Sequence, residues 1–144
     1  MNFQYTSDGL HLTEQFEGCK LQAYTDSGGV WTIGYGHTAD VSEGDTCTQE
    51  EAESFLQQDT QRCVNQINRD VTLATLTQEE FNALVDFGFN LGLHALETST
   101  LWRLLMAGDI DGAAAQFPRW DKCGGVEVAG LLRRRMAEKK EFEA

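Results

Sequence analysis

The sequence predicts a mostly helical α+β fold, in which a small N-terminal lobe with a β-hairpin and a larger helical lobe are joined by a long helix. Two observations carry this prediction. A glycine-rich turn flanked by aromatic and β-branched residues occurs near the N-terminus. Helical apolar periodicity with capping signals dominates the chain from residue 48 onward. We expect one domain, 1–144, with a ligand cleft between its two lobes.

The first element is a short helix in "SDGLHLTEQFEG", residues 7–18. Ser7 or Asp8 can cap its N-terminus, because both side chains accept hydrogen bonds from free backbone N–H groups. Gly18 suits the position just past its end. Glu17 is therefore expected in the last helical turn.

The hairpin follows in "LQAYTDSGGVWTIGYGHT", residues 21–38, with its turn at "DSGG". Side chains alternate between the two faces of a strand. This alternation assigns Trp31, Ile33 and Tyr35 to one face and Thr32 to the other. Thr32 is therefore expected to point away from the apolar face.

Two capping boxes mark the starts of the main helices. Thr48–Glu51 precedes an amphipathic pattern that predicts one long helix over about 49–69. Thr77–Glu80 begins a more apolar helix that ends at Gly92 and is expected to lie in the core.

The remaining sequence predicts three further helices. "STLWRLLMAGD" and "IDGAAAQFPRW" suit two short helices that are separated at Gly108 and stopped at Pro118. "GLLRRRMAEKKEF" suits a terminal helix.

Composition excludes several classes of protein. The formal charge of 11 − 23 = −12 argues against nucleic acid and anionic membrane surfaces as partners. The chain has neither a long apolar run nor a basic, apolar leader, so we expect no membrane span and synthesis in the cytoplasm without a signal peptide. The four cysteines lack zinc-site spacing, and the sequence leaves open buried thiols or up to two disulfides. We expect a monomer without metal or cofactor.

Glu17, Asp26 and Thr32 are the residues that suggest chemistry. Cleavage of a glycosidic bond requires one carboxylic acid that protonates the leaving oxygen and a second, ionised group. The negative end of a helix and apolar neighbours favour a protonated Glu17. Asp26, in a glycine-rich turn, suits the ionised group, and the Thr32 hydroxyl can hold a water beside it. Asp26 can also be read simply as a turn former.

"FEGCKLQAYTDSGGVWTIGYGHT" resembles the catalytic signature of the phage-type lysozymes (endolysins, glycoside hydrolase family 24), in which Glu, eight residues, Asp, five residues and Thr follow one another. The resemblance continues through "LTQEEFNALVDFGFNLG" to "GLLRRRMAE". It implies a lysozyme-like fold and hydrolysis of the β-1,4 bond between N-acetylmuramic acid and N-acetylglucosamine in bacterial peptidoglycan, causing host cell lysis. Glu17 would be the general acid, and Asp26 with Thr32 would activate water with inversion. A nucleophilic Asp26, with retention, is the alternative.

The resemblance extends to further residues. It implies substrate contacts by Thr38, Phe89, Asn90 and Thr100, although Phe89 also suits plain core. It implies a structural ion pair between His37 and Asp59. It also places a basic residue near the acid, for which Arg133, Arg134 and Arg135 are candidates; these arginines suit a solvated helix face equally well.

Three functional readings remain at this stage. The resemblance favours an endolysin that reaches the cell wall after membrane permeabilisation. The alternatives are a wall-degrading module of a phage tail or secretion apparatus, and a peptidoglycan-binding protein that has lost turnover. Intact Glu17, Asp26 and Thr32 argue against the binding protein, which would not need all three.

Overall fold

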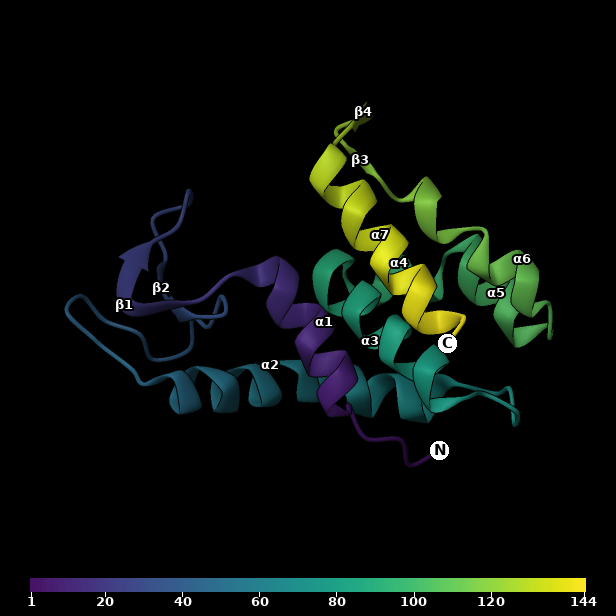
Figure 1. Cartoon of the computed structure of the whole chain (residues 1–144), viewed down its shortest axis with the longest axis horizontal. Coiled ribbons are helices and arrows are strands. Elements are labelled where there is room, and N and C mark those ends of the chain that lie inside the picture. The colour runs from purple at the N-terminus through teal and green to yellow at the C-terminus, as the bar shows by residue number, and fades with distance from the viewer. The chain divides into compact units, whose positions relative to one another are not determined.

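The computed structural model describes all residues, Met1–Ala144 (Figure 1). The chain forms seven α-helices, one 3-10 helix and two small two-stranded sheets, so it is mostly helical, as predicted. It divides into two compact units. The smaller unit is Thr13–Arg62, and the larger unit combines Met1–Leu12 with Cys63–Ala144.

The small unit begins in helix α1, Ser7–Glu17. Glu17 is the last helical residue, as the sequence predicted. Gly18 follows with φ of 69°, a conformation that glycine adopts at little cost and that commonly ends a helix.

The predicted hairpin is present as β1, Lys20–Thr25, and β2, Trp31–Gly34. The strands are antiparallel, and their register is irregular. Lys20 pairs with Gly34, and Tyr24 pairs with Thr32. Between these two pairs the chain moves four positions along β1 but only two along β2, so β1 contains extra residues. Such a bulge bends the longer strand.

Helix α2, Gln49–Asp70, is the predicted long helix. Its capping box is formed, because the Thr48 N–H donates to Glu51 at 3.0 Å and the Glu51 N–H donates to the Thr48 hydroxyl at 3.1 Å. The helix contributes its first part, up to Arg62, to the small unit and its remainder to the large unit. No helix of the chain has both the length and the apolar character to cross a bilayer.

Helix α3, Gln78–Leu91, forms the centre of the large unit. Its nine residues from Glu80 to Gly88 are all buried, and Thr77 and Glu80 complete the predicted capping box. It packs against α7, Ala129–Phe142, and the two helices lie side by side in Figure 1. Most of the buried apolar residues of the chain join the core around α3; its largest completely buried apolar side chains are Phe81, Phe87, Phe117, Ile67, Leu84, Leu96, Leu101 and Leu105.

Short elements surround this core: α4 is Leu93–Glu97, α5 Thr100–Met106, α6 Ile110–Ala114, η1 Phe117–Arg119, β3 Lys122–Cys123 and β4 Val126–Glu127. The sequence did not predict α4 or the β3–β4 hairpin, because both are too short to show periodicity. The expected stop at Pro118 is also wrong, since this proline lies inside η1, where a first-turn position needs no N–H donor.

All four cysteines are free thiols in the structure. Cys63 is buried, Cys47 is half-buried, and Cys19 and Cys123 are exposed. Of the two possibilities left by the sequence, buried thiols therefore describe Cys63 alone.

Candidate active site

The carboxyl group of Glu17 lies against a tight turn that follows β2. Ile33 and His37 exchange both backbone hydrogen bonds at 2.9 Å, which closes the turn around Tyr35. Gly36 within it has φ of 83°, and a Cβ at this position would lie 3.5 Å from Glu17 Oε1. The backbone of Gly36 therefore forms part of the immediate surroundings of the Glu17 carboxyl.

Asp26 is held in one orientation by the hairpin turn. Its Oδ1 accepts hydrogen bonds from the N–H groups of Gly28 at 2.8 Å and Val30 at 2.9 Å. Its own N–H donates to the Val30 carbonyl at 2.9 Å. The residue is exposed, and Oδ2 accepts no hydrogen bond from the chain. One carboxylate oxygen is thus anchored, while the other is available to a water or a ligand.

Thr32 is joined to Asp26 through the backbone of Val30. The Thr32 hydroxyl donates to the Val30 carbonyl at 2.9 Å, and the same carbonyl accepts the Asp26 N–H. Thr32 is only 4% exposed. Because its proton is used in this bond, the Thr32 oxygen offers its remaining lone pairs as acceptors.

The bulge in β1 shortens the path between the two carboxyl groups. Lys20, just after Glu17, pairs with Gly34, and Thr25, just before Asp26, pairs with Trp31. The part of β2 between these pairs spans only about 10 Å at the usual rise of a strand. The hairpin therefore places Asp26 and Thr32 at the start of β2, while the Glu17 carboxyl lies beside the turn that follows the end of β2.

His37 ties this turn to helix α2. Its Nδ1 lies 2.9 Å from Oδ2 and 3.1 Å from Oδ1 of Asp59. Its ring stacks on Phe55, with 4.2 Å between centroids and planes within 7°. Since His37 directly follows Gly36, these contacts restrain the backbone beside Glu17.

The four residues implied in substrate contact fall in both units. Thr38 is exposed in the small unit, directly after His37. Phe89, Asn90 and Thr100 belong to the large unit. Phe89 is half-buried against the core, and Thr100 is exposed at the start of α5.

The three consecutive arginines of α7 do not form a solvated face. Only Arg133 is exposed, whereas Arg134 and Arg135 are 4% and 0% exposed. That reading is therefore wrong for the latter two. Helical spacing brings positions 134, 135 and 138 onto the buried side of α7.

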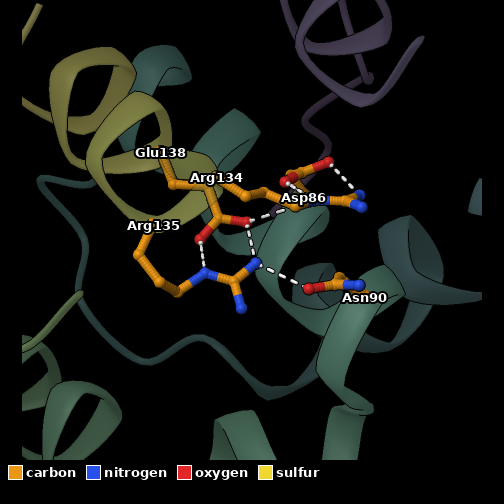
Figure 2. A network of polar contacts seen from close by, with 5 residues as sticks. All are labelled: Asp86, Asn90, Arg134, Arg135 and Glu138. Carbon is orange, nitrogen blue, oxygen red and sulfur yellow. Dashed lines mark hydrogen bonds and ion pairs between the residues drawn. The ribbon is translucent and has the colours of Figure 1, made fainter. Parts of the chain in front are cut away.

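Arg134 and Arg135 build a buried polar network between α7 and α3 (Figure 2). Arg134 forms two 2.9 Å bonds to the carboxylate of Asp86. Arg135 contacts Glu138 at 2.6 and 2.8 Å and donates to Asn90 Oδ1 at 2.8 Å. Burial raises the pKa of Glu138 well above 4.5, as does nearby Asp86, while Arg135 opposes the rise.

Sequence reasoning missed several of these residues. Gly36 and Val30 act through their backbones, and the glycines of "IGYG" were the only signal for the turn. The acidic partners Asp86 and Glu138 are far apart in sequence and carry no motif. The run of three arginines was the one available sign of the network.

Gly36→Ala is expected to reduce activity beyond its effect on stability. Left-handed backbone costs a non-glycine residue about 1–2 kcal/mol, and the added methyl group would contact Glu17 Oε1 at 3.5 Å. Gly44→Ala is a matched control, because Gly44 has φ of 85° and nothing within 4 Å of its Cβ position. Thermal unfolding should show similar losses for both variants, while the hydrolysis rate of folded protein should fall only for Gly36→Ala. Equal rates would exclude a role for this contact.

Comparison with known proteins identifies the family. The model of the phage lysozyme family matches residues 14–138. The chain is 41% identical to an endolysin of Acyrthosiphon pisum secondary endosymbiont phage 1, over 94% of this chain and 95% of that protein. It is also 40% identical to the endolysin of Bacillus phage PZA. That match covers 98% of this chain and 55% of the longer relative. The crystal structure of a P22 lysozyme mutant, 33% identical, superposes with a TM-score of 0.92 over 99% of this chain and 100% of that one. The chain therefore belongs to the phage lysozyme family of glycoside hydrolases.

Proposed function

We propose that this enzyme cleaves the β-1,4 bond between N-acetylmuramic acid and N-acetylglucosamine in bacterial peptidoglycan, with inversion at the anomeric carbon. The observation that carries the proposal is the arrangement of Asp26 and Thr32 around Val30 at the start of β2, together with the Glu17 carboxyl beside the turn that follows β2. The reaction requires an acid and a second, ionised carboxylate, and an acceptor hydroxyl beside that carboxylate can help to orient the attacking water.

Glu17 is assigned the role of general acid. It protonates the glycosidic oxygen as the bond to the anomeric carbon breaks, which makes the departing sugar a neutral alcohol. Gly36 suits this role, since its missing side chain leaves space beside Oε1, at the position where a Cβ would lie 3.5 Å away. A leaving oxygen must approach this carboxyl within hydrogen-bond distance.

Asp26 and Thr32 are assigned to the attacking water. A water bound to both can donate one proton to Asp26 Oδ2 and the other to the Thr32 oxygen, whose own proton is held by the Val30 carbonyl. Both water protons are then engaged, and a water lone pair remains for attack on the anomeric carbon. Asp26 takes one proton as the new bond forms, which leaves a hydroxyl on the sugar.

This water site favours inversion over retention. In the retaining alternative, Asp26 Oδ2 would itself bond to the anomeric carbon, and Thr32 would have no water to orient. We further propose that Thr38, Phe89, Asn90 and Thr100 contact the glycan. The relatives named endolysins support host lysis over a role in a tail or secretion apparatus.

The products of wild-type digestion test the proposal. Purified peptidoglycan should yield fragments with N-acetylmuramic acid at the reducing end, identified by mass spectrometry after borohydride reduction. Proton NMR during the first turnovers should show the α anomer, since the cleaved bond is β. A reducing-end N-acetylglucosamine would overturn the bond assignment, and a first-formed β anomer would overturn inversion while leaving the bond assignment intact.

A further inference from the structure

The side-chain amide of Asn90 has only one chemically allowed orientation. Its Oδ1 lies 2.8 Å from Arg135 Nη2. A guanidinium has donors and no acceptor, so the amide atom that faces it must be the oxygen. The NH2 group of Asn90 therefore points away from Arg135 (Figure 2). It makes no hydrogen bond within the chain, although the residue is half-buried.

Arg135 is itself rigidly held. Glu138 accepts hydrogen bonds from its Nε at 2.6 Å and its Nη2 at 2.8 Å. Its guanidinium lies over the ring of Phe87, 5.2 Å from the centroid. No part of the side chain is exposed to solvent. Asn90 is therefore oriented by a group that has no freedom to move aside.

The Arg135 guanidinium is poorly explained by stability alone. Its Nη1 is buried and has no hydrogen-bond partner. An unsatisfied buried donor is unfavourable, and well-packed apolar residues often replace buried ion pairs without loss of stability. Within the guanidinium, Nη2 also donates to Asn90, which is the accessible residue of this network.

We propose that Arg135 is a positioning residue that holds the Asn90 NH2 group outward, and that this group donates a hydrogen bond to the acetamido carbonyl oxygen of a bound sugar. This rests on the proposed function, in which the substrate is an N-acetylated glycan. A carbonyl oxygen is an acceptor only, so it requires a donor and cannot use an inverted amide. A sugar hydroxyl both donates and accepts, and would not require a fixed orientation.

The inference predicts a preference for N-acetylated glycan. A de-N-acetylated sugar presents an ammonium group, which only donates and therefore cannot pair with the Asn90 NH2 group. A site with an unpaired polar group discriminates strongly between such ligands. The preference should depend on Asn90 and on the orientation that Arg135 imposes.

The test variant is Asn90→Asp. Aspartate keeps the size of asparagine and can still accept from Arg135 Nη2, but its outward atom becomes an acceptor. Binding is measured by calorimetry in a Glu17→Gln background, which prevents cleavage, with a tetrasaccharide of alternating N-acetylglucosamine and N-acetylmuramic acid and with its de-N-acetylated form. The Kd for the N-acetylated form should rise about tenfold, while the Kd for the other form should not rise.

Asn82→Asp is the matched control on the same helix. Asn82 is 1% exposed, and its NH2 group donates to Thr6 at 2.8 Å and Glu141 at 3.1 Å. An aspartate at position 82 would place a carboxylate against that of Glu141, and the two negative charges would repel each other. Tm should therefore fall without a change in Kd. Arg135→Lys retains the charge but lacks the two-pronged contact, and should weaken N-acetylated binding less than Asn90→Asp.

An unchanged Kd for Asn90→Asp would overturn the inference, as would equal losses for both forms of the glycan. Failure of the proposed function has a different signature. In that case wild type would not cleave peptidoglycan, whatever the binding measurements show. Because Asn90→Asp leaves the Arg135–Glu138 pair in place, a folding defect should not obscure the result.

Discussion

Glu17→Gln is expected to lower the rate of peptidoglycan hydrolysis by about 10²–10⁴-fold, which is the usual contribution of a general acid. Glutamine has nearly the same shape as glutamate but carries no acidic proton, so the glycosidic oxygen would leave as an alkoxide. Binding of the glycan should change little. The measurement is clearance of outer-membrane-stripped bacteria, followed by turbidity, together with release of soluble fragments from purified wall.

The control for this experiment is Glu50→Gln. Glu50 is exposed in the first turn of α2, and Glu50→Gln removes the same charge at a residue that has no assigned role in the reaction. Its clearance rate should equal that of wild type. If Glu17→Gln cleared bacteria as fast as the control, or if wild type cleared none, the assignment of Glu17 as the acid would fail. Asp26→Asn should also be strongly impaired, because an amide cannot take the proton of the water.

Arg135→Met is expected to lower the free energy of unfolding by about 3–5 kcal/mol, the typical cost of leaving a buried charge without its partner. Glu138 is completely buried and would lose both bonds to Arg135. Replacing both residues, as Arg135→Met with Glu138→Leu, should recover much of the loss, because no charge is then stranded. Denaturant unfolding measures both variants, and a double variant as unstable as the single one would contradict this explanation.

The cost of Arg135→Met should depend on pH. Burial raises the pKa of Glu138 in the folded protein, so the folded chain keeps a proton that the unfolded chain releases above 4.5. The contribution of Glu138 to the free energy of unfolding is therefore lost as the pH rises from 4.5 through the raised pKa of the folded state. Without Arg135 this loss is larger, so the variant should be less impaired at pH 5 than at pH 8. A difference independent of pH would show that lost packing dominates.

The sequence was sufficient for the elements whose signals are local. Capping boxes placed the starts of α2 and α3 correctly, and the glycine-rich turn predicted the hairpin. Glu17 lies at the helix end that its sequence predicted. These features depend on residues within a few positions of one another, so the chain alone specifies them. The helix α4 and the β3–β4 hairpin were missed because each contains too few residues to show a period.

The surroundings of the candidate site depend on contacts that no local pattern contains. The sequence indicated Asp26 and Thr32 by spacing, but only the hairpin register shows that Val30 links them and leaves Thr32 an acceptor. Gly36 became relevant because a turn returns it to the end of α1.

The arginines of α7 show the difference between local and tertiary information most clearly. Three adjacent cations have the composition of an exposed face, and intrinsic preference alone favours solvent. Packing of α7 on α3 instead buries Arg134 and Arg135 against Asp86, Glu138 and Asn90. The sequence by itself determined the longer helices, the N-terminal hairpin and the family. Only the tertiary structure decided which charges are paired and how Asn90 is oriented, because those partners are up to 48 positions apart in the chain.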